Sequence, residues 1–176
     1  MEFANLIKKL VTPAGFAAPA RLTHDDVEAR ALTRADLADD VRGINASIEL
    51  IRRTRGGGGG WPEEPVTEEY NFVDAVWHEL EFRDGTSFTY AVYGPDGYLG
   101  CAYLYPMGRR TQLTPELMSY DVDVSFWVTP DGYERGYYGK LHAGLQRWLA
   151  DEFPFWRPYW SNRELPGQTA GPRSRP

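Results

Sequence analysis

The stretch from Tyr133 to Leu141 has the composition of an anion-binding site. It reads YERGYYGKL, and Leu145 and Trp148 then continue the apolar pattern of Leu141 at helical spacing. A glycine-containing loop that leads into a helix presents free backbone N–H groups at the helix start, and such groups bind phosphates and other anions. We therefore expect this loop to hold an anion.

Two carboxylates precede the loop on a predicted strand, 122–128. Its residues alternate between an apolar set and a largely polar set: Val122, Val124, Phe126 and Val128 against Asp121, Asp123, Ser125 and Trp127. The pattern predicts a half-buried strand. Asp121 and Asp123 are candidate general bases, acting directly or through water. The alternative, that both carboxylates simply face solvent, stays open.

Composition excludes several other classes of function. The 176 residues suit one domain, and a net charge of −6 with a pI near 5.1 argues against a general nucleic-acid or anionic-membrane binder. The single cysteine, Cys101, excludes an internal disulfide, and no Cys and His cluster has metal-site spacing. No apolar run approaches the ~20 residues of a membrane span, and the N-terminus lacks a signal-peptide pattern. We expect a cytoplasmic protein without a metal.

Periodicity and turn residues predict the elements that position these groups. They are a strand at 26–33, helices at 34–54 and 68–82, a hairpin of strands 88–93 and 98–105, the strand at 122–128, a helix through 141–149 and an aromatic strand at 153–160. This order predicts an α/β (α+β) fold with a mixed, mainly antiparallel sheet and flanking helices. The domain, 24–162, contains a glycine loop at 56–60 that we expect to be flexible. An N-terminal arm, 1–23, and a disordered tail, 163–176, flank it.

This order and the motifs within it resemble the GNAT superfamily of acyl-CoA-dependent N-acetyltransferases. The hairpin FTYAVYGPDGYLGCAYLYP carries Gly100 where hairpins of that family commonly have glycine, and VDVSFWV is similar to the family's central strand. The loop 133–141 corresponds to the family's pyrophosphate loop. Asn162 is similar to the asparagine that often follows the family's fifth strand. The resemblance spans residues 27–162.

The resemblance implies that acetyl-CoA or another acyl-CoA is the cofactor and that the acyl group passes to an amine of a small molecule or a protein. The backbone of Phe126, Trp127 and Val128 would pair with the pantetheine arm as another strand would. The remaining cofactor-binding candidates lie at the loop, the helix start and the end of the last strand: Arg135, Gly136, Tyr137, Tyr138, Gly139, Lys140 and Asn162. Tyr138 is also a candidate general acid. No nucleic acid or membrane is implied, and a homodimer is compatible with the aromatic C-terminal strand.

The sequence departs from the family pattern in two places. The signature Arg/Gln-x-x-Gly-x-Gly/Ala, aligned on Arg135, puts Tyr138 and Lys140 at its glycine positions. The family usually continues after the fifth strand with a helix and two strands, whereas this sequence becomes rich in Pro and Gly after Asn162, so we expect a C-terminally truncated version. The alternative function is a catalytically inactive GNAT-like domain that binds a ligand or a protein.

Overall fold

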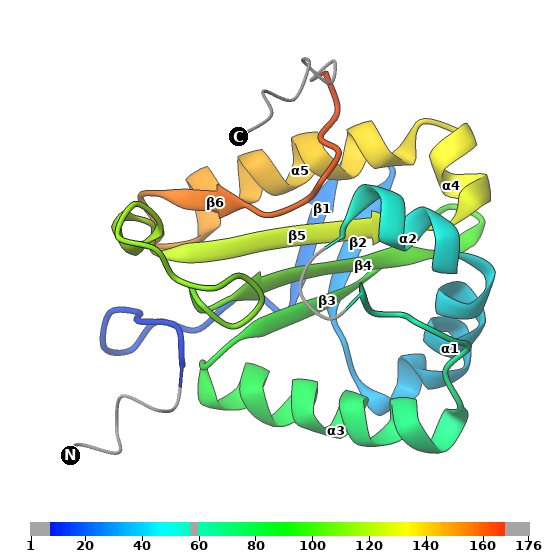
Figure 1. The fold of residues 1–176 in the computed structure, drawn as a ribbon, viewed down its shortest axis with the longest axis horizontal. Coiled ribbons are helices and arrows are strands. Elements are labelled where there is room, and N and C mark those ends of the chain that lie inside the picture. Colours follow the sequence, from blue (N-terminus) through cyan, green and yellow to red (C-terminus); the bar gives the residue numbers. More distant parts are fainter. Residues whose placement is uncertain (1–7, 57–59, 168–176) are drawn as a thin grey trace.

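The computed structural model describes residues 8–56 and 60–167, and Figure 1 shows a curved sheet with helices on both of its faces. The strands pair in sequence order: β1 (Arg21–His24), β2 (Val27–Ala31), β3 (Phe88–Gly94), β4 (Gly97–Tyr105), β5 (Val122–Val128) and β6 (Pro158–Trp160). All neighbours are antiparallel except β5 and β6, which run parallel. The predicted fold class, a mixed and mainly antiparallel sheet with flanking helices, is confirmed.

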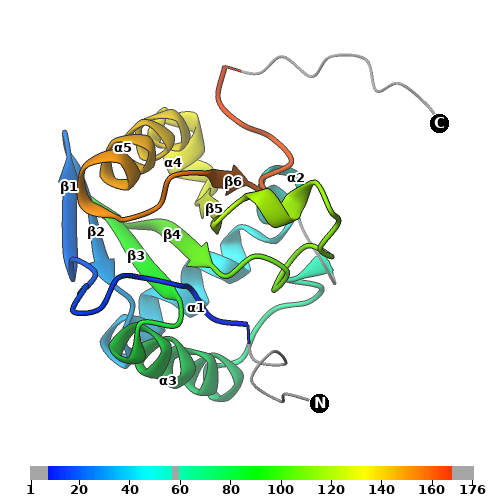
Figure 2. The ribbon, with the colours of Figure 1, turned by 90° about the vertical axis from the view of Figure 1, so that its left-hand side faces the viewer.

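Five α-helices in the described residues cover this sheet. They are α1 (Leu37–Ala46), α2 (Ile48–Thr54), α3 (Glu68–Asp84), α4 (Pro130–Glu134) and α5 (Tyr137–Glu152). Figure 2 shows α5 and α4 on one side of the sheet and α1 and α3 on the other. Single 3₁₀ turns at Arg34–Asp36 and Leu117–Ser119 complete the described elements. No helix in the described residues is both long and apolar enough to cross a bilayer.

Three local predictions differ from the structure. The strand expected at 26–33 is present as β2, but β1 before it was not expected, and the two form a hairpin whose turn includes Asp25 at a φ of +51°. The single helix expected at 34–54 is broken at Ser47, whose hydroxyl donates a hydrogen bond to the carbonyl of Gly43. The loop expected between β5 and α5 contains α4, whose N-cap Thr129 accepts from the N–H of Gly132. At Ser47 and at Thr129, short-range hydrogen bonds between side chain and backbone accompany the change from the expected structure.

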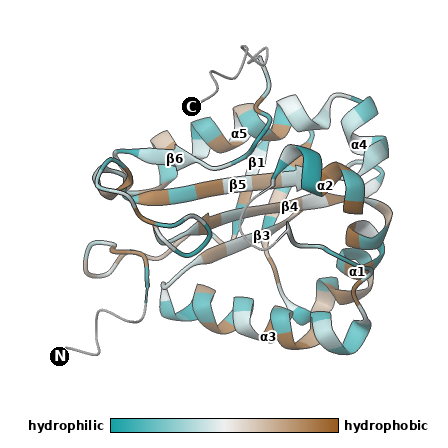
Figure 3. Ribbon diagram, in the orientation of Figure 1, coloured by the Kyte–Doolittle hydropathy of each residue, from teal (hydrophilic) through white to brown (hydrophobic). Residues whose placement is uncertain are grey.

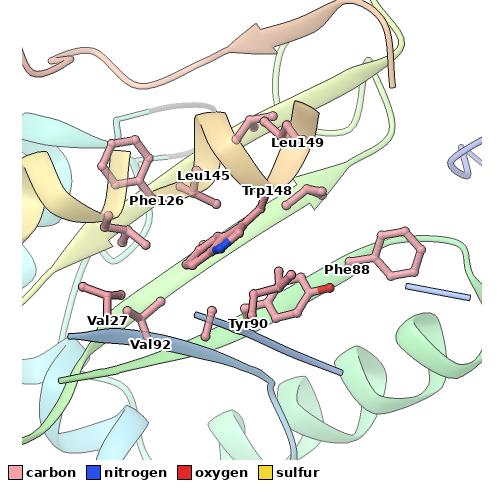
Figure 4. Packing of buried hydrophobic residues seen from close by; sticks show 14 of the residues in the cluster. Val27, Phe88, Tyr90, Val92, Phe126, Leu145, Trp148 and Leu149 are labelled. Atoms are coloured by element: carbon pink, nitrogen blue, oxygen red, sulfur yellow. The ribbon is translucent and has the colours of Figure 1, made fainter. Parts of the chain in front are cut away.

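The core lies on both faces of β5, so the prediction of a half-buried strand was wrong. All seven residues of β5 are buried. Figure 4 shows Phe126 on one face beside Leu145, Trp148 and Leu149 of α5. On the other face the indole of Trp127 donates to the hydroxyl of Tyr103, 2.9 Å away. Figure 3 shows the corresponding concentration of hydrophobic residues on the central strands.

The segments outside the expected domain are partly described. Before β1, Leu10 is buried and its N–H donates to the carbonyl of Thr86 at 2.9 Å, while Phe16 packs edge-on against Phe88. After β6, residues 163–167 follow a defined path along α2 and α5. The N-terminal arm is thus docked from residue 8 onward. Residues 57–59 of the glycine loop and residues 168–176 of the tail lie outside the described residues.

Gly100 lies on β4 directly against the backbone of β5, opposite Val128. It has a φ of +154°, and a Cβ built at this position would lie 2.0 Å from the carbonyl oxygen of Trp127. Any other residue would therefore have to push the two strands apart at the middle of the sheet.

We expect Gly100→Ala to lower the free energy of unfolding by about 3 kcal/mol, through backbone strain and the displaced strand. Gly139→Ala is the matched control, since Gly139 lies inside α5 with open space at the Cβ position. It should leave stability unchanged or raise it slightly. Urea unfolding of both variants measures the difference, and equal stabilities would show that the β4–β5 contact is not tight.

The buried ring of His78 on α3 lies between two carboxylates. Its Nε2 is 3.2 Å from Asp74, and its Nδ1 is 3.6 Å from Glu81. Burial lowers the pKa of His78, but the hydrogen bonds to Asp74 and Glu81 outweigh burial and raise the pKa to about 8. The other groups packed around the ring and these carboxylates are Thr89, Tyr103, Tyr105 and Arg109.

Stability should therefore fall as the pH rises through the pKa of His78. The folded protein holds this proton more tightly than the unfolded chain, whose histidine pKa is about 6.5. The contribution, about 2 kcal/mol, is complete below about pH 6.5 and is lost as the pH passes about 8. Urea unfolding across this range measures it. His78→Gln should flatten the dependence, and an unchanged slope in this variant would assign the effect to another group.

Candidate functional site

The site is organised by the way β5 and β6 part. The parallel pairing runs from Val122 opposite Pro158 to Val124 opposite Trp160, and the N–H of Ser161 still donates to the carbonyl of Val124 at 3.0 Å. Beyond this point β5 continues to Val128 paired only with β4, and on its β6 side no strand lies beside it in the described part of the chain. A sheet edge therefore opens in the interior of the protein, and it begins next to Phe126.

The backbone groups along this edge alternate in direction. The N–H of Phe126 donates to Oδ1 of Asn162 at 3.0 Å, and Nδ2 of Asn162 donates to the carbonyl of Phe126 at 2.9 Å. Because the peptide groups of a strand point alternately to its two neighbours, Val128 faces the same edge, whereas Trp127 faces β4. Two of the three residues predicted to pair with pantetheine, Phe126 and Val128, thus face the opening. The backbone N–H and carbonyl of Phe126 are already hydrogen-bonded to Asn162.

The start of α5 lies beside this edge. Its N-cap, Gly136, has a φ of +84°, and no side chain caps the helix. The N–H of Lys140 donates back to the carbonyl of Gly136 at 3.3 Å, so the N–H groups before it lack an intrahelical acceptor. A cavity of about 520 Å³ adjoins this helix start, lined by Tyr133, Gly136, Tyr138, Gly139, Glu164, Leu165, Pro166 and Gly167. Gly139 has no side chain to narrow it, and a Cβ there would meet nothing within 4 Å.

The basic residues predicted at this loop are engaged elsewhere. Arg135 pairs with Asp96 at 2.6 Å and with Asp131 at 3.1 Å, beside the β3–β4 turn. Lys140 binds Asp26 at 2.8 Å, which raises the pKa of the ammonium group, and the hydroxyl of Tyr137 donates to the same carboxylate. The structure brings Gly136, Tyr138 and Gly139 to the cavity, whereas the side chains of Arg135, Tyr137 and Lys140 are tied to surface carboxylates. The anion site predicted at this loop would therefore depend on backbone N–H groups.

The two predicted bases differ in their surroundings. Asp121 lies at the start of β5, where its carboxylate accepts from the N–H groups of Trp156 and Arg157 at 2.7 and 3.1 Å. Asp123 is fully buried where the two strands part. One of its oxygens accepts from the hydroxyl of Ser161, while Oδ2 is buried without a partner in the described part of the chain. Asp121 thus holds the chain before β6, and Asp123 keeps an oxygen free to accept a proton.

Burial sets the protonation of Asp123. It raises the pKa of the carboxyl group, against the hydrogen bond from Ser161 and the positive charges of Arg110 and Arg55, which act to lower it. Arg110 donates to Ser161 at 2.7 Å, and Arg55 lies over the ring of Tyr103 at 3.8 Å and donates to Ser125 at 3.1 Å. A buried carboxyl group with a raised pKa is suited to accept a proton near neutral pH.

Tyr138 lies on the other side of the opening. Its ring packs against Phe126 with 4.7 Å between centroids, and its hydroxyl accepts from Nδ2 of Asn162 at 2.7 Å and donates to the carbonyl of Glu164. Burial raises the pKa of this hydroxyl group. Tyr138 therefore remains protonated near neutral pH, and it lines the cavity at the helix start, as a proton donor there would have to.

Four residues of the site were not among the sequence candidates: Arg55, Arg110, Ser161 and Glu164. They come from the end of α2, the loop after β4 and the segment after β6, and no local pattern connects them. Of the four, Arg110 came closest to being predicted from the sequence, because it lies in a polar connection between two predicted strands. Within the described residues, no group of three or more His, Cys, Asp or Glu side chains could hold a metal ion.

Comparison with known proteins finds relatives at the level of structure. No family model and no curated protein sequence matches the chain. A solved structure of RimL, the ribosomal L7/L12 alpha-N-protein acetyltransferase, in complex with coenzyme A is similar over 76% of this chain and 68% of its own, with a TM-score of 0.53 and 12% identity.

Two further structures are similar to a comparable extent. The Salmonella typhimurium acetyltransferase that modifies the N-terminal serine of L7/L12 matches over 72% of this chain and 65% of its own, with a TM-score of 0.53 and 10% identity. The ribosomal-protein-S5-alanine acetyltransferase of Vibrio fischeri matches over 75% and 68%, with a TM-score of 0.51 and 6% identity. Together with the parting of β5 and β6, these likenesses show that the chain has the fold of the GNAT N-acetyltransferase superfamily.

Proposed function

We propose that this protein binds acetyl-CoA or another acyl-CoA and transfers the acyl group to an amine of a small molecule or a protein. The observation that carries the proposal is the open edge of β5 beside the uncapped start of α5. An extended arm with amide groups fits the edge, and a pyrophosphate fits the N–H groups at the helix start. The coenzyme A bound to RimL, a protein of the same fold, supports this choice of ligand.

The residues present fit such a ligand in both parts. The backbone of Val128 and Phe126 would hold the amide-bearing arm, and the N–H groups of residues 137–139 would hold the phosphates. The cavity of about 520 Å³ at the helix start offers room for the phosphates, and Gly139 lets them approach the backbone. Bound there, acyl-CoA supplies an activated thioester.

The side chains at the opening supply the proton transfers. Asp123, with its free Oδ2, accepts the proton that the amine loses as it forms the new amide bond, directly or through a water molecule. The hydroxyl of Ser161 donates to the other oxygen of Asp123, and Arg110 in turn donates to that hydroxyl. The hydroxyl of Tyr138 donates its proton to the sulfur that leaves as the thioester bond breaks. Each proton lost by one group is thus taken up by another.

The second candidate function is a non-catalytic domain of the same fold that binds a ligand or a protein. The observation that favours it is the occupation of the Phe126 peptide by Asn162, which already satisfies the edge that the cofactor would use. In that function Asp123 would serve the fold alone. The two candidates therefore make opposite predictions for variants of Asp123.

Titration calorimetry with acetyl-CoA tests the binding step. The proposal expects saturable heat, and no heat at millimolar acetyl-CoA would contradict it. Release of free thiol in the presence of a panel of amines and peptides with free N-termini tests the transfer step.

Asp123→Asn and Asp121→Asn form a matched pair on the same strand. Asp123→Asn should lower kcat by about 100-fold or more and leave the affinity for acetyl-CoA unchanged, since the general base is lost. Asp121→Asn should cost about 2 kcal/mol of stability, because two backbone N–H groups lose a charged acceptor, with kcat unchanged. Equal kcat values for both variants would show that Asp123 is not the general base, and no thiol release by the wild type with any acceptor would favour the non-catalytic function.

A further inference from the structure

The segment after β6 runs across the opening instead of away from it. In Figure 1 it leaves β6 and crosses beside the second half of β5 toward the first turns of α5. Residues 162–165, which we term the strap, contact four elements on this path: β5, α2, α4 and α5.

The first part of the strap imitates a bound amide. The carboxamide of Asn162 accepts from the N–H of Phe126 and donates to its carbonyl, at 3.0 and 2.9 Å. This two-bond pairing is the one that an amide of an extended ligand would make with the edge of β5. Asn162 is buried, so the pairing is sheltered from water.

The next part spans the gap between α2 and α5. The N–H groups of Arg163 and Glu164 donate to the carbonyls of Arg55 and Thr54 at 3.3 and 3.0 Å, which are the last carbonyls of α2. The carbonyl of Glu164 accepts from the hydroxyl of Tyr138. The strap thus links the C-terminus of α2 to the start of α5. It crosses the open edge of β5 at Phe126, which we term the groove.

The carboxylate of Glu164 fixes the strap at the cavity. It accepts from the hydroxyl of Tyr133 on α4 and lies 3.4 Å from Arg53 on α2. Leu165 packs against the core cluster on the α5 side of the sheet, and Glu164 and Leu165 both line the cavity of about 520 Å³. An acidic side chain therefore stands beside the N–H groups at which an anion would bind.

We propose that the strap is an intramolecular ligand that closes the groove, and that acyl-CoA binds only after displacing it. This inference rests on the proposed function, because it concerns access to the same groove. The N–H groups at the helix start stay open beside the cavity, whereas Asn162 blocks the edge of β5 at Phe126. A ligand can therefore bind the N–H groups first and then replace the strap along β5.

The contacts that hold the strap are few enough to be exchanged. The Arg53–Glu164 pair is partly exposed, and exposed ion pairs contribute little. The bonds of Asn162 to Phe126 would be replaced one for one by an incoming amide. Since a closed groove lowers the apparent affinity by the fraction of molecules that are open, weakening the strap should tighten binding.

Titration of the full chain with coenzyme A tests this in four variants. Asn162→Ala frees the Phe126 peptide, and Glu164→Ala and Glu164→Gln remove the carboxylate with and without a change of size. Each should lower the Kd about 3- to 10-fold. Glu134→Ala is the matched control, since Glu134 is an exposed glutamate on the neighbouring α4 with no hydrogen bond or ion pair among the described residues. Its Kd should stay within about twofold of the wild type, which separates the strap from a general effect of charge.

Trypsin cleavage after Arg163, followed by intact mass in the wild-type chain, reports the strap directly. Coenzyme A should accelerate this cleavage severalfold as the strap leaves the groove. Protection of Arg163 by coenzyme A, with weaker binding in Asn162→Ala, would overturn the proposal and make the strap a fixed wall of the site, while the proposed function would stand. Absence of binding in the wild type and every variant would overturn both.

Discussion

The parting of β5 from β6 is the constraint on which the rest of the site depends. Three residue pairs hold the two strands together, and beyond Ser161 the edge of β5 has no strand beside it. In a buried sheet such an edge must find hydrogen-bond partners, because unsatisfied peptide groups are costly away from water. Here Asn162 supplies them for Phe126. The same peptide groups of β5 that need hydrogen-bond partners thus make a groove for an amide-bearing ligand and hold the segment that closes it.

The burial and contacts of both candidate proton-transfer groups, Asp123 and Tyr138, follow from how close each lies to the place where β5 and β6 part. Asp123 is the residue of β5 opposite Tyr159, one pair before the strands part, and the sheet buries it on both sides. Tyr138 reaches the same place from α5, with its ring on Phe126. Asp121, two residues earlier, is still at the margin, where it binds backbone N–H groups. Two positions along one strand therefore separate a structural carboxylate from a candidate base.

Sequence patterns predicted the order of the secondary-structure elements better than the contacts between them. The hairpin of β3 and β4, the helix α3 and the unit β5–α5 were all expected, because each has a strong internal period and clear turn residues. The burial of Asp123 was not foreseen, since alternation shows that a strand has two faces but not what covers each of them. Ser161, Arg110 and Glu164 meet only in three dimensions. The tail was expected to be disordered from its composition, yet the N–H groups of Arg163 and Glu164 find acceptors at the end of α2 that no local pattern reveals.

The sheet order has a consequence for how the protein assembles. Strands β1 to β5 form four antiparallel pairs between neighbours in sequence, although α1, α2 and α3 separate β2 from β3. The pair β5–β6 is parallel and requires α4 and α5 to be in place as the crossover. Both the β2–β3 pair and the β5–β6 pair therefore need a long connection to close before their contacts are gained. The β6 side of β5 takes shape only when its crossover has closed, and the strap, which follows β6 in the chain, can make its contacts only once β5, α2, α4 and α5 are in place.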